Sequence, residues 1–272
     1  MSEVGPVGRP AGPPEPGPFD VGLLERYQAE VLRWNRQMNL VSRRNPEERL
    51  AGLVRQSVAA ALALPGVLEP LSLEAAAVVG GRCASHFRKL EYIDIGSGCG
   101  VPGVVWHVVL GRTATADAGG AGPVRDSVFV ESRAKRAWFL DRCVRHLGLQ
   151  SARAVTATWG EGESFLSALP DHADDEGPTL WLLSLQALRL TDPELISGWR
   201  QATARGRLPE GDELVIARLR SQNVEGTEEA GLEALRHDLS LPGDGCVRFC
   251  RCGTGEGSGA LLISYYRELP GS

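Results

Sequence analysis

Hydrophobic and polar positions in the first part of the chain repeat with the period of a helix. Between Phe19 and Met38 the apolar and aromatic side chains are Leu23, Leu24, Tyr27, Val31, Trp34 and Met38. This spacing places them on one face of an amphipathic helix. A second helix is predicted from Pro46 to Leu64, because Asn45 can cap its start and Pro65 would end it. We therefore expect a helical region over residues 19–90.

From Glu91 the pattern changes to short apolar runs that alternate with helical stretches. Strands are predicted at Tyr92–Ile95, Ser127–Glu131, Ala152–Thr158, Thr179–Leu185 and Glu213–Leu219. Helices are predicted at Val104–Leu110, Arg133–Leu147, Gly162–Leu169 and Pro193–Arg205, and two surface loops at Thr115–Asp126 and Pro170–Pro178. Alternation of this kind predicts a parallel sheet with helices on both faces.

The end of the chain departs from this alternation. After a helix predicted at Thr227–His237, the runs CVRFCRC and ALLISYYREL predict two antiparallel strands joined by GTGEGSG. The expected fold class is therefore α/β, a Rossmann-like, mostly parallel seven-stranded sheet with an antiparallel C-terminal strand, preceded by N-terminal helices. This is the organisation of class I methyltransferases, and it is expected over residues 91–272.

Composition adds two expectations about the rest of the chain. Residues 1–18 are dominated by proline and glycine, which predicts a disordered tail. The N-terminus lacks the basic and apolar regions of a signal peptide, and no apolar run reaches the length of a membrane span. We therefore expect a cytoplasmic protein whose six cysteines are reduced thiols and which holds no metal.

A glycine-rich turn follows the first predicted strand. In DIGSGCGVPG, Asp94 ends the strand and Gly96, Gly98 and Gly100 precede Val101 at the start of a helix. Ligands of open α/β sheets bind beyond the carboxyl ends of the strands, and backbone without side chains allows their close approach. The third glycine comes one residue early for the dinucleotide-binding pattern, so S-adenosylmethionine is favoured over a nicotinamide cofactor.

The second predicted strand supplies a carboxylate at the same edge of the sheet. It ends at Glu131, followed by Ser132. A carboxylate in this place can accept hydrogen bonds from both hydroxyls of a ribose. The alternative is a surface glutamate that caps the next helix.

Three segments together resemble the small-subunit ribosomal RNA methyltransferase G family, also called glucose-inhibited division protein B. They are YQAEVLRWNRQMNLVS, DIGSGCGVPG and VFVESRAKRAWFL, and the similarity extends over roughly residues 27–219. The resemblance implies S-adenosylmethionine as the methyl donor and N7 of a guanine in 16S ribosomal RNA as the acceptor. It also implies that Gly96, Val101, Glu131 and the Gly160-Glu161 pair of TWGEGE contact the cofactor.

The chain departs from that family's pattern at three places. Trp159 stands where the family has an arginine, and Leu185-Gln186 replaces an arginine after the fourth strand. Leu53 and Gln56 stand where the family has histidine and aspartate. Guanine N7 carries a free lone pair, so its methylation needs alignment and no general base, and no catalytic residue is assigned.

Basic residues are clustered although the net charge is −5. The clusters are Arg133, Lys135, Arg136, Arg142 and Arg145; Arg33, Arg36, Arg43, Arg44 and Arg55; and Arg82, Arg88 and Lys89. They predict either an RNA-binding face or ordinary solvated helix faces. Trp34 is expected to pack, with base stacking as the alternative.

These observations lead to one main functional prediction. We expect a monomeric methyltransferase of ribosomal RNA or of the small ribosomal subunit, with Lys135, Arg136 and Arg189 binding the substrate. The alternatives are a methyltransferase of a small molecule or another RNA, and a catalytically silent cofactor-binding module that associates with the ribosome.

Overall fold

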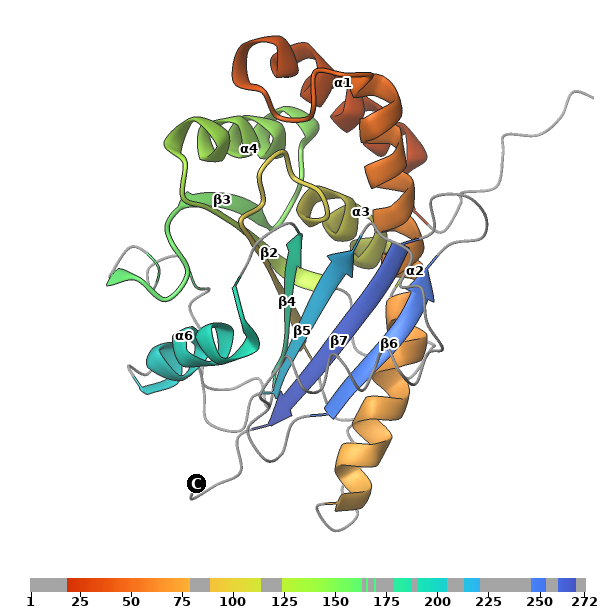
Figure 1. The fold of residues 1–272 in the computed structure, drawn as a ribbon, viewed down its shortest axis with the longest axis vertical. Helices are drawn as coiled ribbons and strands as arrows, with labels where there is room; N and C mark the ends of the chain where they lie inside the picture. Colours follow the sequence, from red (N-terminus) through yellow and green to blue (C-terminus); the bar gives the residue numbers. More distant parts are fainter. Residues whose placement is uncertain are drawn as a thin grey trace, which may run out of the picture.

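The computed structural model describes residues 19–78, 89–113, 124–162, 165, 169, 179–186, 190–204, 213–220, 246–252 and 259–267. At its centre lies a seven-stranded sheet with the order β3-β2-β1-β4-β5-β7-β6 (Figure 1). The strands are β1 (Lys89–Ile95), β2 (Val124–Glu131), β3 (Ala152–Thr156), β4 (Thr179–Gln186), β5 (Glu213–Arg220), β6 (Cys246–Cys252) and β7 (Gly259–Arg267).

The direction of the strands confirms the expected fold class. Strands β1 to β5 pair in parallel, whereas β7 is antiparallel to both of its neighbours, β5 and β6. The chain builds outward from β1 to β3 and then returns to place β4 on the other side of β1. This order with an antiparallel β7 is the topology of class I methyltransferases. The β1–β4 junction is its topological switch point, where such sheets bind ligands.

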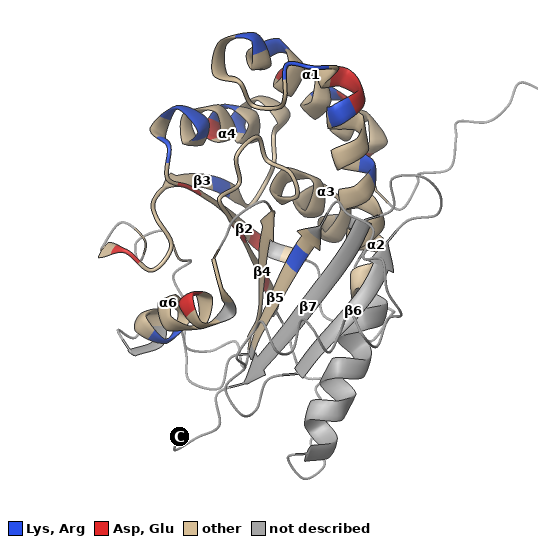
Figure 2. Cartoon of the chain, viewed as in Figure 1, with Lys and Arg blue, Asp and Glu red and all other residues tan. Residues whose placement is uncertain are grey.

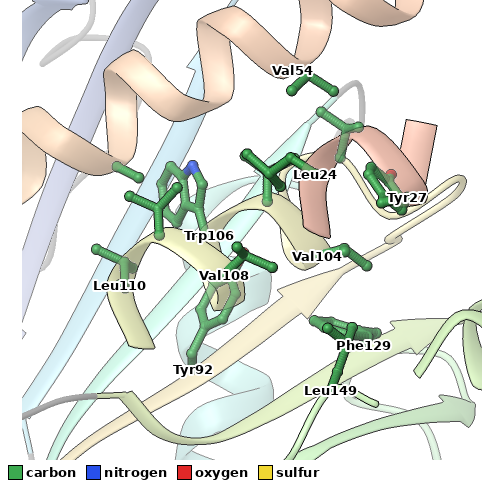
Figure 3. Close-up of a cluster of buried hydrophobic side chains, with 14 of the residues drawn as sticks. Leu24, Tyr27, Val54, Tyr92, Val104, Trp106, Val108, Leu110, Phe129 and Leu149 are labelled. Atoms are coloured by element: carbon green, nitrogen blue, oxygen red, sulfur yellow. The ribbon is translucent and has the colours of Figure 1, made fainter. Parts of the chain in front are cut away.

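Helices cover both faces of the sheet. One face packs against α2 (Pro46–Val78), α3 (Gly103–Thr113) and α4 (Ala134–Leu147), and α1 (Val21–Met38) packs on these three helices. Figure 3 shows part of this core, in which Trp106 of α3 stacks on Tyr92 of β1 with ring centroids 5.8 Å apart. On the opposite face, α6 (Asp192–Ala204) buries Leu195 and Trp199 against the sheet.

The alternation of side chains along the strands explains these two cores. In β1, Leu90 and Tyr92 point to the face of α3, whereas Ile93 and Ile95 point to the face of α6. The other parallel strands alternate in the same way, as expected for a sheet that is buried on both sides. The same period places Asp94 and Glu131 on the face of α3.

The second helix is longer than predicted. It continues through Pro65 to Val78, for a total of 33 residues, instead of ending at Leu64. A proline inside a helix removes one hydrogen bond and costs about 3 kcal/mol. Helix α2 as a whole contacts α3, β6 and β7, and such contacts between distant segments could not be inferred from the local pattern. Even so, no helix in the described part of the chain is both long and apolar enough to cross a membrane.

Other boundaries shift by a few residues. Strand β2 begins at Val124, which pairs with Leu90, so the predicted loop Thr115–Asp126 is wrong in its last three residues. Strand β3 ends at Thr156, two residues earlier than predicted. The predicted tail, the helix Thr227–His237 and the loop GTGEGSG lie outside the described residues, as do Arg82 and Arg88.

Candidate functional site

The glycine-rich turn is fixed by backbone hydrogen bonds at the carboxyl ends of β1 and β2. The Gly96 and Ser97 amides both donate to the Val130 carbonyl, at 2.8 and 3.1 Å, and the Gly100 amide donates to the Ser97 carbonyl at 2.6 Å. The φ angles of Gly96, Gly98 and Gly100 are 69°, 58° and 101°. This left-handed conformation explains why glycine occupies all three positions.

Two of these glycines have different surroundings. A Cβ placed on Gly98 would meet only the Gly96 carbonyl oxygen, at 3.7 Å. A Cβ on Gly100 would instead approach Val104, the Tyr27 hydroxyl and Leu140, at 2.8 to 3.1 Å. Gly100 is therefore required by packing, whereas Gly98 presents bare backbone with open space beside it.

Glu131 faces this open backbone. Its Oε2 accepts a hydrogen bond from the Gly98 amide at 3.0 Å, and its Oε1 accepts one from the Arg133 amide at 2.8 Å. The side chain is almost fully buried, at 4% exposure. Glu131 thus joins the carboxyl end of β2, the glycine-rich turn and the start of α4. Each carboxylate oxygen has two lone pairs, so a second acceptor position remains on each.

Asp94 lies behind the turn in a buried hydrogen-bonded chain. Its Oδ1 accepts from Ser184 Oγ of β4 at 2.5 Å, and Ser184 Oγ lies 2.7 Å from the Tyr92 hydroxyl. Burial raises the pKa of Asp94 from 3.8 to about 7, although the Ser184 and Ser97 hydroxyls lower it. With no exposed surface, Asp94 supports the turn from beneath, and its direct access to a ligand is blocked.

We expect Asp94 to make the stability of the protein depend on pH. The folded protein holds the Asp94 proton up to about pH 7, whereas the unfolded chain releases it near 3.8. The contribution of Asp94 is therefore most favourable below about pH 4 and is lost as the pH rises to about 7, by about 1.4 kcal/mol per unit of pKa difference. Urea unfolding of wild type and Asp94→Asn across this range should show the variant gaining relative stability with rising pH. Parallel pH profiles would contradict this role.

The segment after β3 carries the next predicted cofactor residues. Gly160 has a φ of 74°, and the exposed Glu161 donates its amide to the Thr158 carbonyl at 3.2 Å. Trp159, at the position of the expected arginine, is buried against α6, where its Nε1 donates to the Leu195 carbonyl at 3.2 Å. A Cβ on Gly198 would overlap the Trp159 indole, so the two residues form a matched packing pair.

The segment after β4 is anchored by a residue that the sequence did not single out. Arg189, predicted to bind substrate, lies outside the described residues. Arg218 of β5 is buried, at 8% exposure, and donates to the Leu190 carbonyl at 2.7 Å. It holds the beginning of the segment that leads into α6.

Two further residues of the site were missed by sequence reasoning. The fully buried Tyr27 donates its hydroxyl to the Cys99 carbonyl at 2.8 Å, which attaches α1 to the glycine-rich turn. Ser184 connects Asp94 to Tyr92 as described above. The helical period identified Tyr27 only as a core residue, and nothing in the sequence distinguished Ser184 from other strand residues.

Basic side chains lie on the helices α1, α2 and α4. Figure 2 shows Lys and Arg on α4, on α1 and the turn after it, and on the first part of α2. Lys135 is exposed and Arg136 is partly exposed at the start of α4, and Ser132 before them is exposed as well. These residues directly follow Glu131, so a basic surface begins beside the turn.

A cavity of about 420 Å³ lies at the start of α2. It is lined by Arg44, Asn45, Glu48, Arg49, Gly52, Leu53, Arg55 and Gln56. Three guanidinium groups therefore outnumber one carboxylate around it. Leu53 and Gln56, two of the departures from the family pattern, belong to this cavity. Among the described residues, no group of three potential metal ligands occurs.

About half of the chain is similar in sequence to proteins that have been named. No family model matches it. Ribosomal RNA small subunit methyltransferase G of Paracidovorax citrulli is 30% identical over 138 residues, which cover 50% of this chain and 49% of the relative. The protein of the same name from Haemophilus ducreyi is 24% identical over 143 residues, covering 50% and 53%. The chain thus spans about half the length of the curated relatives that it matches.

The similarity to solved structures is low. An O-methyltransferase from Bacillus cereus is 13% identical, covers 88% of this chain and 90% of its own, and has a TM-score of 0.41. The order and directions of the strands by themselves define the fold class. Over about half its length, the chain is similar in sequence to proteins named ribosomal RNA small subunit methyltransferase G.

Proposed function

We propose that this protein is an S-adenosylmethionine-dependent methyltransferase that acts on N7 of a guanine in 16S ribosomal RNA. The observation that carries the proposal is the pairing of Glu131 with the open backbone of Gly98 at the switch point of the sheet. The names of the relatives support the choice of ribosomal RNA as the substrate.

The residues at the switch point fit this cofactor. A Cβ on Gly98 would meet only the Gly96 carbonyl oxygen, so a nucleoside can approach the backbone of the turn at this point, and we assign Gly96 and Val101 as further contacts. The remaining lone pairs of Glu131 can accept both ribose hydroxyls, because its two backbone donors use only one position on each oxygen. We assign Ser132, Gly160 and Glu161 to the periphery of the same site. Asp94 and Gly100 position the turn from beneath.

The chemistry asks little of the protein beyond alignment. When bound, S-adenosylmethionine would supply a methyl group on a positively charged sulfur. As the guanine N7 lone pair forms the new bond to this methyl group, the carbon–sulfur bond would break and leave a neutral thioether. The task of the chain is to hold the base in line with the methyl group and to exclude water. The absence of an identified general base is therefore compatible with activity.

Phosphate contacts would come from the basic helices. Lys135 and Arg136 stand at the edge of the cofactor site, and the arginine-lined cavity of α2 offers a second contact. Arginine suits this role because its planar guanidinium binds phosphate with two hydrogen bonds. A local basic surface of this kind compensates for the overall charge of −5.

Methyl transfer from labelled donor tests the proposal. We expect incorporation into isolated small ribosomal subunits or deproteinised 16S RNA, and none into a pool of control proteins. Cleavage chemistry specific for 7-methylguanosine should locate the label at one guanine. Label at a different type of atom would reject the N7 assignment. Cofactor binding without any transfer to RNA would favour the silent module, and transfer only to small molecules would favour the other alternative.

A further inference from the structure

An exposed tryptophan lies on α4 close to the proposed cofactor site. Trp138 is 46% exposed, unlike the buried Trp106, Trp159, Trp181 and Trp199. Arg133, the residue just before α4, donates its amide to Glu131. Trp138 follows five residues later, which is about 7 Å along the helix axis. The exposed ring therefore belongs to the helix that begins beside the proposed cofactor site.

The ring of Trp138 is held in place by Trp34 of α1. The two rings meet edge to face, with centroids 5.1 Å apart and an interplanar angle of 75°. Trp34 is fixed in turn, because its Nε1 donates to Glu30 at 3.2 Å and the Arg142 guanidinium lies 5.3 Å from its ring centroid. Trp34 therefore packs, as predicted, and it also orders its exposed neighbour.

The surroundings of this aromatic pair are mainly basic. Lys135, Trp138, Arg142 and Arg145 are spaced three and four residues apart, so they follow one side of α4. Two carboxylates neutralise part of this charge: Glu30, which contacts Arg33, Arg142 and His146, and Asp141, which pairs with Arg145. Lys135 and Arg136 add to the excess of cations. An exposed apolar ring amid positive charge suits a polyanion that carries aromatic bases.

We propose that Trp138, ordered by Trp34, is a stacking platform for an unpaired base of the RNA substrate, with Lys135 and Arg142 contacting the adjacent phosphates. This inference rests on the proposed function, because it concerns how the same RNA reaches the cofactor site. An exposed aromatic ring can stack on the unpaired bases of a single strand. It binds a duplex less well, because the bases of a duplex are already stacked on one another. A ring ordered in advance also loses less conformational freedom on binding.

The test measures binding of the full chain to a short single-stranded RNA and to the same sequence as a duplex. We expect Trp138→Ala to weaken single-strand binding by about 5- to 100-fold, and Trp138→Phe to retain most of it. Leu62→Ala is the matched control, because Leu62 on α2 has the same 46% exposure and should leave binding unchanged. Lys135→Gln should reduce the slope of log affinity against log salt concentration by about the amount that one phosphate contact contributes. Trp138→Ala should leave this slope unchanged.

Calorimetric binding of S-adenosylmethionine separates the two proposals. All four variants should bind the cofactor as wild type does, since none alters Gly98 or Glu131. Wild-type RNA affinity in Trp138→Ala would overturn the platform alone, as would equal losses in the Ala and Phe variants. If Trp138→Ala binds RNA as wild type does but binds intact small subunits more weakly, Trp138 contacts a ribosomal protein and the platform proposal is overturned. Failure of the wild type to bind any RNA would refute the RNA substrate and the platform together.

Discussion

Glu131→Ala is expected to weaken S-adenosylmethionine binding by at least tenfold, about 1.4 kcal/mol. The substitution removes the proposed acceptor of the ribose hydroxyls. It also leaves the Gly98 and Arg133 amides without their carboxylate partner, so the turn loses its side-chain link to the end of β2 and the start of α4, although its backbone hydrogen bonds to Val130 remain. Isothermal calorimetry of the purified variant measures the change directly.

Two further variants separate binding from folding. Glu131→Gln preserves the volume of the side chain but removes its charge and presents a donor to one backbone amide, so it should also bind the cofactor more weakly. Glu25→Ala removes an exposed carboxylate from α1 and should bind as wild type does. Thermal unfolding of each variant shows whether it is folded at the temperature at which the cofactor affinities are compared. Wild-type affinity in both Glu131 variants would remove the basis of the cofactor assignment.

Gly100→Ala is expected to lower the free energy of unfolding by about 2–5 kcal/mol. The substitution forces an alanine into a φ of 101° and places its Cβ 2.8 Å from Val104 and 3.1 Å from Leu140. Both neighbours are buried and cannot move aside without disturbing the core between α1, α3 and α4. Urea unfolding measures the loss.

Gly98→Ala provides the matched control for that prediction. At a φ of 58° alanine also pays the free-energy cost of a left-handed backbone, but its Cβ would enter open space. We therefore expect a loss of only about 1–2 kcal/mol, and the difference between the two variants reports the clash at Gly100. In contrast, Gly98→Val should impair cofactor binding because it fills the space beside the turn. Equal destabilisation by the two alanine substitutions would show that backbone conformation alone decides both positions.

The sequence predicted the fold well because its signals are local and repeated. The alternation of strand and helix patterns after Glu91 predicted the parallel sheet, and the last two apolar runs predicted its antiparallel end. Errors arose where distant parts of the chain act on a local signal. Pro65 does not end α2, which contacts α3, β6 and β7, elements that the local pattern around Pro65 does not reveal. Val124 joins β2, because β1 provides a partner for it.

For the site, the sequence by itself determined which segments meet: the carboxyl ends of parallel strands share one edge, so the glycine-rich turn and Glu131 had to be neighbours. Only the tertiary structure decided the role of each residue there. It divided the glycines into the open Gly98 and the enclosed Gly100, buried Asp94 beneath the turn, and joined Tyr27 to the Cys99 carbonyl. The physical reason is that burial, pKa and hydrogen-bond partners depend on neighbours that are remote in sequence. Tyr27 and Cys99 are 72 residues apart, and Asp94 and Ser184 are 90 apart.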